Sequence, residues 1–326
     1  MRILITIFLL AVLALGGWVG WAVYTPVVPP GNQSVLLHAG YSTRRIGAEL
    51  KKAGVIRSVF AFRLWYTLHP KHSLKAGEYL FDRAASIPQV YDRIARGDIY
   101  FHLVTIPEGY TMFDIAKTME DAGLGSAGEF LRIARSRTDL VVDMTPEAKS
   151  LEGYLFPNTY QFTRTQSLEE MAATMVHQFR QVAQQIGLNA DVHRTVTMAS
   201  IVEKETAVSE ERPVVASVYY NRLAHRLALD ADPSVIYAQL LAGTYTGSLH
   251  HSDLAIRSPY NTYRFPGLPP GPIGNPGQSA LEAALHPAKT QFFYFVSDGN
   301  GHHRFARNLT EHNRNVAAYR RALGLH

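Results

Sequence analysis

The chain has 326 residues, enough for about two domains, and its 47% hydrophobic and 18% charged residues are typical of a folded protein. It has no cysteine, which excludes disulfides, thiolate metal sites, a cysteine nucleophile and a lipid-modified N-terminal cysteine. The net charge of +5 comes from scattered Lys and Arg residues rather than from a basic stretch interleaved with aromatic residues, so the sequence does not predict a nucleic-acid partner.

A long apolar segment opens the chain. Ile3–Tyr24 has no charged residue over 22 positions, and a helix needs about 20 apolar residues to cross a bilayer. A cleaved signal peptide is the alternative, but its apolar run is typically about 7–15 residues long, and no small-x-small site precedes Thr25. Arg2 lies before the segment and no Lys or Arg occurs in Thr25–Tyr41, so we expect a cytoplasmic N-terminus and an outward-facing bulk.

Short helices and strands are expected next, followed by longer helices. Helical periodicity and turn residues give helices around Ile46–Leu50, Val59–Leu68, Ile87–Ile94 and Met112–Ala122, and strands at Ala76–Phe81 and Leu103–Ile106. Beyond Thr145 the patterns are longer, with helical periodicity over Leu168–Ile186 and Arg194–Leu223, then a loop-rich segment and a strand at Phe292–Val296. The sequence therefore predicts a mixed α+β fold after an N-terminal transmembrane helix.

One acidic residue falls on an apolar helix face. Met198, Ile201 and Val202 form an i, i+3, i+4 stripe, and the i+7 position of that stripe is Glu205. Apolar neighbours raise the pKa of a carboxyl group, as a general acid working near neutral pH requires. We therefore expect Glu205 to be the catalytic acid/base.

Two other roles for the acidic residues remain open. Glu203 lies about 200° around the helix from Glu205, so it is expected to face solvent or a domain boundary. Glu205 could instead form an internal ion pair with Arg212 or Arg222 and only brace the core.

Two loops are candidates for ligand binding. Residues 265–277 are too rich in Pro and Gly for regular structure, and a long rigid loop inside a domain is usually functional, although an inert connector is the alternative. Residues 258–263 combine hydroxyl, amide and aromatic groups, including Asn261 and Tyr263, a mixture that suits sugars and also ordinary turns.

No motif indicates a metal or a cofactor. His250-His251 and His302-His303 lack a ligand-spaced arrangement, and adjacent side chains are expected to point apart. The sequence also lacks a GxSxG elbow, a P-loop and a GxGxxG loop after a strand. We expect neither a metal nor an organic cofactor.

Several blocks resemble, in the same order, the MltG (YceG-like) family of endolytic murein transglycosylases. The blocks are Leu151–Pro157, Met198–Arg212, Val215–Leu223, Ala231–Tyr237, Tyr260–Tyr263, Gly267–Ile273 and His286–Ala288. One departure is Leu229-Asp230-Ala231, where the family more often has a polar Gln-Ser or Gln-Thr before the acid at Asp232. That difference concerns only fine substrate contacts.

The resemblance implies a domain organisation and a catalytic residue. It implies an anchor and linker at residues 1–31, a LysM-like α+β module at 32–101, and a YceG-like catalytic domain at 102–326 with a lysozyme-like catalytic helix. The catalytic Glu precedes Thr in the family pattern, which places it at Glu205, before Thr206. Supporting candidates are Glu152, Thr206, Asp232, Asn261 and Tyr263, and Glu152 is as well suited to a structural role as to orienting substrate or tuning Glu205.

The resemblance also implies a lytic transglycosylase in the bacterial inner membrane with its catalytic domain in the periplasm. It would cleave the MurNAc-GlcNAc bond of glycan strands, leave a 1,6-anhydro-MurNAc end, and terminate or trim nascent strands. Peptidoglycan synthases and the elongation or division machinery are candidate partners. The alternatives are a hydrolase in which an acid such as Asp232 activates water, and a non-catalytic wall-binding scaffold.

Overall fold

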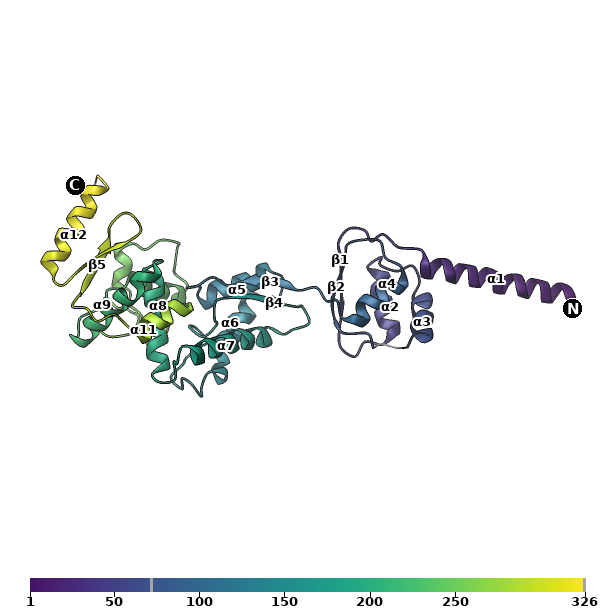
Figure 1. The fold of residues 1–326 in the computed structure, drawn as a ribbon, viewed down its shortest axis with the longest axis horizontal. Helices are drawn as coiled ribbons and strands as arrows, with labels where there is room; N and C mark the ends of the chain where they lie inside the picture. The colour runs from purple at the N-terminus through teal and green to yellow at the C-terminus, as the bar shows by residue number, and fades with distance from the viewer. Residues whose placement is uncertain (71–72, 325–326) are drawn as a thin grey trace. The chain divides into compact units, whose positions relative to one another are not determined.

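The computed structural model describes residues 1–70 and 73–324, and the chain divides into two compact units. The first comprises Met1–Leu103 with Gln161–Ser167, and the second Val104–Tyr160 with Leu168–His326. Helices dominate the described residues, and strands form the two-stranded sheets β1-β2, β3-β4 and β5-β6 (Figure 1). The expected α+β fold is confirmed, while the domain boundaries at 31/32 and 101/102 stay a prediction and residues 325–326 lie outside the described part.

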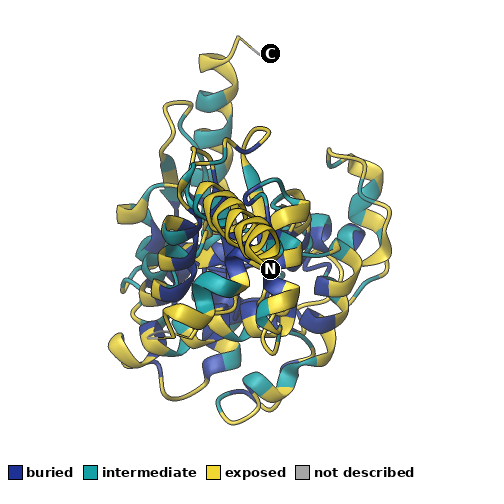
Figure 2. Cartoon of the chain, turned by 90° about the vertical axis from the view of Figure 1, so that its right-hand side faces the viewer, coloured by how far each residue is buried: buried dark blue, intermediate teal, exposed yellow. Residues whose placement is uncertain are grey.

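The N-terminal helix α1 (Arg2–Tyr24) forms where the uncharged segment predicts it. It is long and apolar enough to cross a membrane, and no residue of its most apolar stretch is buried. Figure 2 looks along this helix and shows its almost continuous exposed surface. An apolar helix that the protein itself does not cover is compatible with a membrane anchor.

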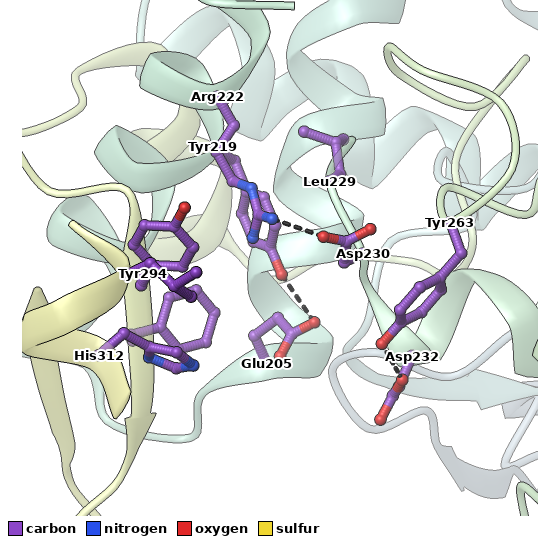
Figure 3. Close-up of a pocket in the computed structure, with 11 residues that line it drawn as sticks. Glu205, Tyr219, Arg222, Leu229, Asp230, Asp232, Tyr263, Tyr294 and His312 are labelled. Atoms are coloured by element: carbon purple, nitrogen blue, oxygen red, sulfur yellow. Dashed lines mark hydrogen bonds and ion pairs between the residues drawn. The ribbon is translucent and has the colours of Figure 1, made fainter. Parts of the chain in front are cut away.

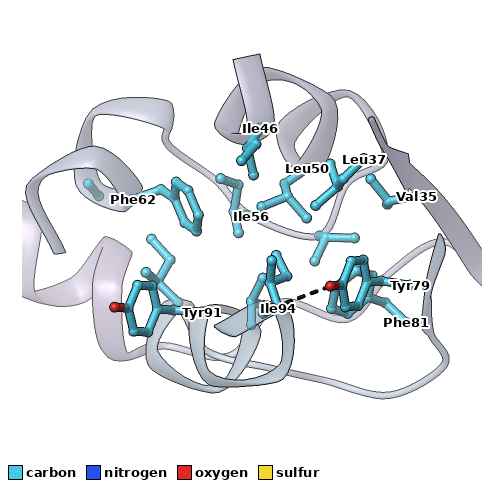
Figure 4. Packing of buried hydrophobic residues seen from close by; sticks show 14 of the residues in the cluster. Val35, Leu37, Ile46, Leu50, Ile56, Phe62, Tyr79, Phe81, Tyr91 and Ile94 are labelled. Carbon is cyan, nitrogen blue, oxygen red and sulfur yellow. Dashed lines mark hydrogen bonds between the residues drawn. The ribbon is translucent and has the colours of Figure 1, made fainter. Parts of the chain in front are cut away.

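The rest of the first unit is a small α+β module around one core. Its elements are β1 (Gln33–Leu37), α2 (Thr43–Lys52), α3 (Val59–Leu68), β2 (Gly77–Phe81) and α4 (Ile87–Arg96). β1 and β2 pair antiparallel from Gln33 opposite Phe81 to Leu37 opposite Gly77. Ser42 and Ser58 cap α2 and α3 by accepting backbone N–H groups, so these starts are encoded locally. Apolar side chains from both strands and the helices meet in the core shown in Figure 4.

Apart from α1, the longest described helices lie in the second unit. Its elements are α5 (Met112–Asp121), α6 (Ala127–Ser136), η1 (Thr138–Leu140), α7 (Leu168–Gln185), α8 (Val192–Glu205), η2 (Ser209–Glu211), α9 (Arg212–Ala224), α10 (Asp232–Ala242), η3 (His251–Ala255), α11 (Gln278–Leu285), β5 (Tyr294–Ser297), β6 (His303–Ala306) and α12 (Leu309–Ala322). β3 (His102–Thr105) and β4 (Thr159–Phe162) pair where the chain passes from one unit to the other. Helices α10 and α11 lie in the segment that was expected to be loop-rich.

The helical pattern over 194–223 is two helices rather than one. α8 ends at Glu205 because Thr206 has an extended backbone (φ −141°, ψ 132°), and α9 starts at Arg212 with Pro213 in its first turn. Periodicity alone did not show this break, since apolar residues continue on both sides of it. The break places Glu205 at the C-terminal end of α8 and lets α9 pack back against α8.

Candidate active site

Glu205 lies in a cavity of about 340 Å³ in the second unit, which is within the usual range of ligand pockets. Figure 3 shows the cavity between α8, α9, the segment before α10, and the β5 and α12 region. The stripe residues Met198, Ile201 and Val202 are fully buried, as the periodicity predicts. Glu205 is only half-buried and is the member of the stripe that lines the cavity.

The carboxyl group of Glu205 accepts a hydrogen bond from a neutral donor. The Tyr219 hydroxyl, on α9, donates to Glu205 Oε1 at 2.8 Å. Burial raises the pKa of Glu205 to about 7, whereas the Tyr219 hydrogen bond opposes this rise and the nearby Asp232 charge adds to it. A carboxyl group with a pKa near 7 can both give and take a proton at neutral pH.

Neither arginine considered as an ion-pair partner for Glu205 fills that role. Arg212 Nη2 lies 2.6 Å from Glu203 Oε1, and Arg222 Nη2 lies 2.5 Å from Asp230 Oδ2. Among the ion pairs of the described residues, none includes Glu205. The core-bracing alternative for Glu205 is therefore not what the structure shows.

The side chain of Glu203 is buried within the second unit, whereas the sequence predicts that it faces solvent or a domain boundary. Its side chain and that of Arg212 are each only 5% exposed, and Glu203 Oε2 also accepts the backbone N–H of Gly277 at 2.9 Å. The angle around α8 correctly separates Glu203 from Glu205. The sequence could not show that the loop at 265–277 and the start of α9 cover the Glu203 side of the helix.

Asp232 and Tyr263 lie together across the cavity from Glu205 (Figure 3). The Tyr263 hydroxyl donates to Asp232 Oδ1 at 2.6 Å. Asp230, in the segment that departs from the family pattern, also lines the cavity and holds Arg222. The structure thus brings Glu205, Asp232 and Tyr263 to one cavity.

An aromatic wall completes the cavity and was not expected from the sequence. Tyr294 and Phe295 from β5 and His312 from α12 line it, and the Tyr294 and His312 rings stack with centroids 5.1 Å apart. The Arg222 guanidinium lies 5.5 Å from the Tyr294 ring centroid. The apolar run at 292–296 predicts a strand, but only tertiary packing brings that strand to Glu205.

Glu152 is fully buried and does not line the cavity. Both of its carboxyl oxygens accept the Met112 N–H, at 3.0 and 2.9 Å, and Oε1 also accepts Asn275 Nδ2 at 2.8 Å. Burial raises the pKa of Glu152 to about 8. This geometry favours the structural role over substrate contact.

Thr206 and Asn261 also make structural contacts. Thr206 is buried directly after α8, and its hydroxyl accepts the Val208 N–H at 3.1 Å. Asn261 is buried, donates from Nδ2 to the Leu254 and Ile256 carbonyls at 3.0 and 2.9 Å, and accepts the Tyr263 N–H at 3.0 Å. Asn261 therefore fixes the turn that presents Tyr263 to the cavity.

The Pro- and Gly-rich loop holds α8 in place. Residues 271–277 are buried, and the Ile273 N–H donates to Ser200 Oγ on α8 at 3.0 Å. Gly153 has φ +88°, and a Cβ atom there would lie 2.4 Å from Pro272 Cγ, so only glycine permits this close approach. The loop is neither an inert connector nor a lining of the cavity around Glu205.

The side chains of the adjacent residues His302 and His303 do not point apart. Both rings contact Glu211, with His302 Nδ1 at 3.1 Å from Oε1 and His303 Nδ1 at 2.6 Å from Oε2. His302 precedes β6, so strand alternation does not separate the two rings. Within residues 1–70 and 73–324, no group of three His, Cys, Asp or Glu side chains could hold a metal ion.

A helix-rich α+β fold with a glutamic acid of raised pKa lining a cavity is the arrangement expected of an enzyme that uses acid–base chemistry. The chain belongs to the YceG-like family, whose pattern it matches over residues 35–318.

Curated relatives and a solved structure agree with this assignment. The chain is 33% identical over 322 residues to the endolytic murein transglycosylase of Bacillus subtilis, covering 92% of this chain and 89% of that protein. It is 31% identical to the endolytic murein transglycosylase of Streptococcus pneumoniae, covering 95% of this chain but 63% of that longer protein. A crystal structure of a yceG-like protein from Listeria monocytogenes has 33% identity and a TM-score of 0.57, covering 87% of this chain and 98% of that one.

Proposed function

We propose that this protein is an endolytic murein transglycosylase, a lyase that cleaves the MurNAc-GlcNAc bond of peptidoglycan glycan strands. The relatives named for this activity match the chain over more than nine-tenths of its length. The observation that carries the proposal is Glu205, a half-buried acid with a pKa of about 7 that opens into a cavity.

The proposed reaction uses Glu205 twice. Its protonated carboxyl group donates to the glycosidic oxygen, so the bond to the MurNAc C1 breaks and an oxocarbenium-like centre forms. The resulting carboxylate then removes the proton from the MurNAc C6 hydroxyl, whose oxygen bonds to C1. The products are a 1,6-anhydro-MurNAc end and a GlcNAc end, and Glu205 regains its proton.

Other residues of the cavity would position the sugar. The aromatic faces of Tyr294 and Phe295 suit the C–H faces of pyranose rings, while the Asp232 and Tyr263 pair offers hydrogen bonds to hydroxyl and acetamido groups. No second catalytic carboxylate is required, because the attacking hydroxyl belongs to the substrate.

The proposed location is the bacterial inner membrane, with the N-terminus in the cytoplasm and the bulk of the chain in the periplasm. The apolar helix α1 and the absence of Lys and Arg in residues 25–41 support this orientation. Peptidoglycan synthases and the elongation or division machinery are proposed partners, since a strand-cleaving enzyme beside the membrane would meet newly made strands.

Product analysis of Glu205→Gln tests the function. Purified glycan strands treated with wild-type protein should yield anhydro ends by mass spectrometry, and Glu205→Gln should lower the rate at least about 100-fold because it removes the acid/base. Glu210→Gln, an exposed carboxyl five residues away, is the matched control and should retain activity. Reducing ends would instead indicate a hydrolase. Wild-type protein that binds sacculi without cleaving them would indicate a scaffold.

A stability measurement shows whether Glu205→Gln is folded. The pKa of Glu205 is raised from 4.5 to about 7, so the native state binds more protons than the unfolded state in this interval and stability falls as pH rises through it. Replacing the acid by a neutral amide should therefore raise the unfolding free energy at pH 8 by about 1–3 kcal/mol, with little change at pH 4. An inactive variant with this gain has lost chemistry rather than structure.

A further inference from the structure

The C-terminal turn of α1 is built into the first unit. Ala22 and Val23 are buried in the core cluster of this module, and Val19 packs against it. The Arg57 guanidinium donates to the carbonyls of Thr25 and Pro26 at 2.6 and 3.0 Å, just after the helix ends. The anchor therefore meets the module through a packed joint rather than through a free linker.

Aromatic contacts connect α1 to α3 and to Arg57, which lies two residues before α3. Arg57 lies 4.8 Å from the Trp21 ring centroid, and Tyr24 meets the Trp65 ring edge-on at 5.9 Å. Trp and Tyr side chains are characteristic of the boundary between lipid and water. Figure 1 shows α3 beside the end of α1, with β1 and β2 at the opposite end of this module.

The length of α1 determines how close the module lies to the lipid. From Ile3 to Trp18 the helix spans about 24 Å at 1.5 Å per residue, whereas the hydrocarbon core is about 30 Å thick. The helix reaches that length only if the turn from Val19 to Val23 is included. That turn packs against the module, so the part of the module around it must lie at the bilayer interface.

An apolar stripe on α3 is exposed at both of its ends. Phe60, Leu64 and Leu68 follow at i, i+4 and i+8 on one face, and Phe60 and Leu68 are 55% and 66% exposed. Arg63 is exposed beside them. Large apolar side chains rarely form a contiguous exposed patch unless the patch contacts a partner or a membrane.

We propose that the first unit docks on the phospholipid bilayer through α3, with Phe60, Leu64 and Leu68 in the interfacial layer and Arg63 near lipid phosphates. The occupant is lipid rather than another protein because α3 packs against the end of α1, whose apolar segment is the proposed membrane anchor. Docking holds the module at a fixed height and orientation on the membrane. The proposal rests on α1 crossing a membrane and is independent of the proposed catalytic activity.

Spin labels test this proposal cleanly because the chain has no cysteine. Leu68→Cys and Phe60→Cys in the full chain, each labelled with a nitroxide, are incorporated into single-protein nanodiscs containing anionic phospholipid. Ala39→Cys, an exposed position two residues after β1, is the matched control. Power-saturation EPR then measures how often each nitroxide collides with oxygen, which concentrates in lipid, and with a nickel chelate, which stays in water.

The oxygen-to-nickel ratio should be several-fold higher at positions 60 and 68 than at position 39. Equal, water-like ratios at all three positions would overturn the proposal. Protection of positions 60 and 68 from both reagents would also overturn it, because it would show that protein covers the stripe. Cleavage of glycan strands by each labelled protein is measured separately, so loss of docking and loss of activity are distinguishable.

Discussion

At the scale of single residues, three buried or half-buried glutamic acids differ in what surrounds them. Glu203 has a charged partner, Arg212, and Glu152 accepts hydrogen bonds from Met112 and Asn275. Glu205 has the Tyr219 hydroxyl and an open cavity. Only Glu205 combines a raised pKa with access for a ligand, so it is the one suited to proton transfer.

Tyr219→Phe should change the pH dependence of cleavage. In the proposed mechanism Glu205 must be protonated for the first step, so activity should fall as pH rises through its pKa of about 7. The hydrogen bond from the Tyr219 hydroxyl lowers that pKa, so its removal should move the alkaline limb of the pH–rate profile to higher pH. It should also reduce kcat about tenfold, because the Glu205 side chain is held in position less firmly.

Tyr220→Phe is the matched control for this experiment. The cleavage rate of both variants and of the wild type is measured between pH 5 and pH 9. Tyr220 is the next residue on α9, but its hydroxyl donates to the Ala284 carbonyl at 2.9 Å rather than to Glu205. An unchanged alkaline limb in Tyr219→Phe would show that the Tyr219 hydroxyl does not act on Glu205.

At the scale of elements, α8 depends on the loop at 265–277. Asn275 is fully buried, and its Oδ1 accepts the Leu155 N–H at 2.9 Å. Its Nδ2 donates to the Tyr110 carbonyl and to Glu152, both at 2.8 Å. The Asn275 side chain therefore joins its own loop to two other chain segments, one at Tyr110 and one at Glu152–Leu155.

Asn275→Ala should lower the unfolding free energy by about 2–4 kcal/mol, because it leaves the buried Leu155 N–H without a partner and removes a donor from Glu152. Chemical denaturation measures the loss. Asn313→Ala, an exposed position on α12, is the control and should change stability by less than about 0.5 kcal/mol. Equal stability of the two variants would contradict the role assigned to Asn275.

At the scale of the whole molecule, the N-terminal helix α1 is part of a folded unit. Ala22 and Val23 lie in the module core together with residues of both strands and of helices α2, α3 and α4. A purely flexible tether would leave these side chains exposed. The joint makes the stability of the module depend on the end of α1.

Truncation tests this dependence. A chain starting at Val19 keeps the buried turn, whereas a chain starting at Thr25 loses it, and the shorter chain should lose about 2–3 kcal/mol of stability in the first unit. Thermal unfolding of both chains in detergent measures the difference. The transition of the second unit serves as the internal control, and identical first-unit transitions would exclude a structural role for the end of α1.

Local sequence signals determined much of the fold. The uncharged apolar segment predicted α1, and apolar periodicity with turn residues predicted α3 and α4 close to their observed bounds and the middle of α2. The same periodicity placed Glu205 on the buried face of α8. These features depend on residues within a few turns of one another, which is why they can be recognised without knowing the fold.

Only the tertiary structure decided which groups surround Glu205. Tyr219, Tyr294 and His312 come from segments 14 to 107 residues further along the chain, and no local pattern relates them to α8. The sequence did not show the partners of Glu203 and Glu152 either. One partner of each lies in the loop at 265–277, and no local pattern predicts where that loop packs. Periodicity shows which face of a helix is buried, whereas the identity of the groups that cover it, and hence its pKa and chemistry, depends on long-range packing.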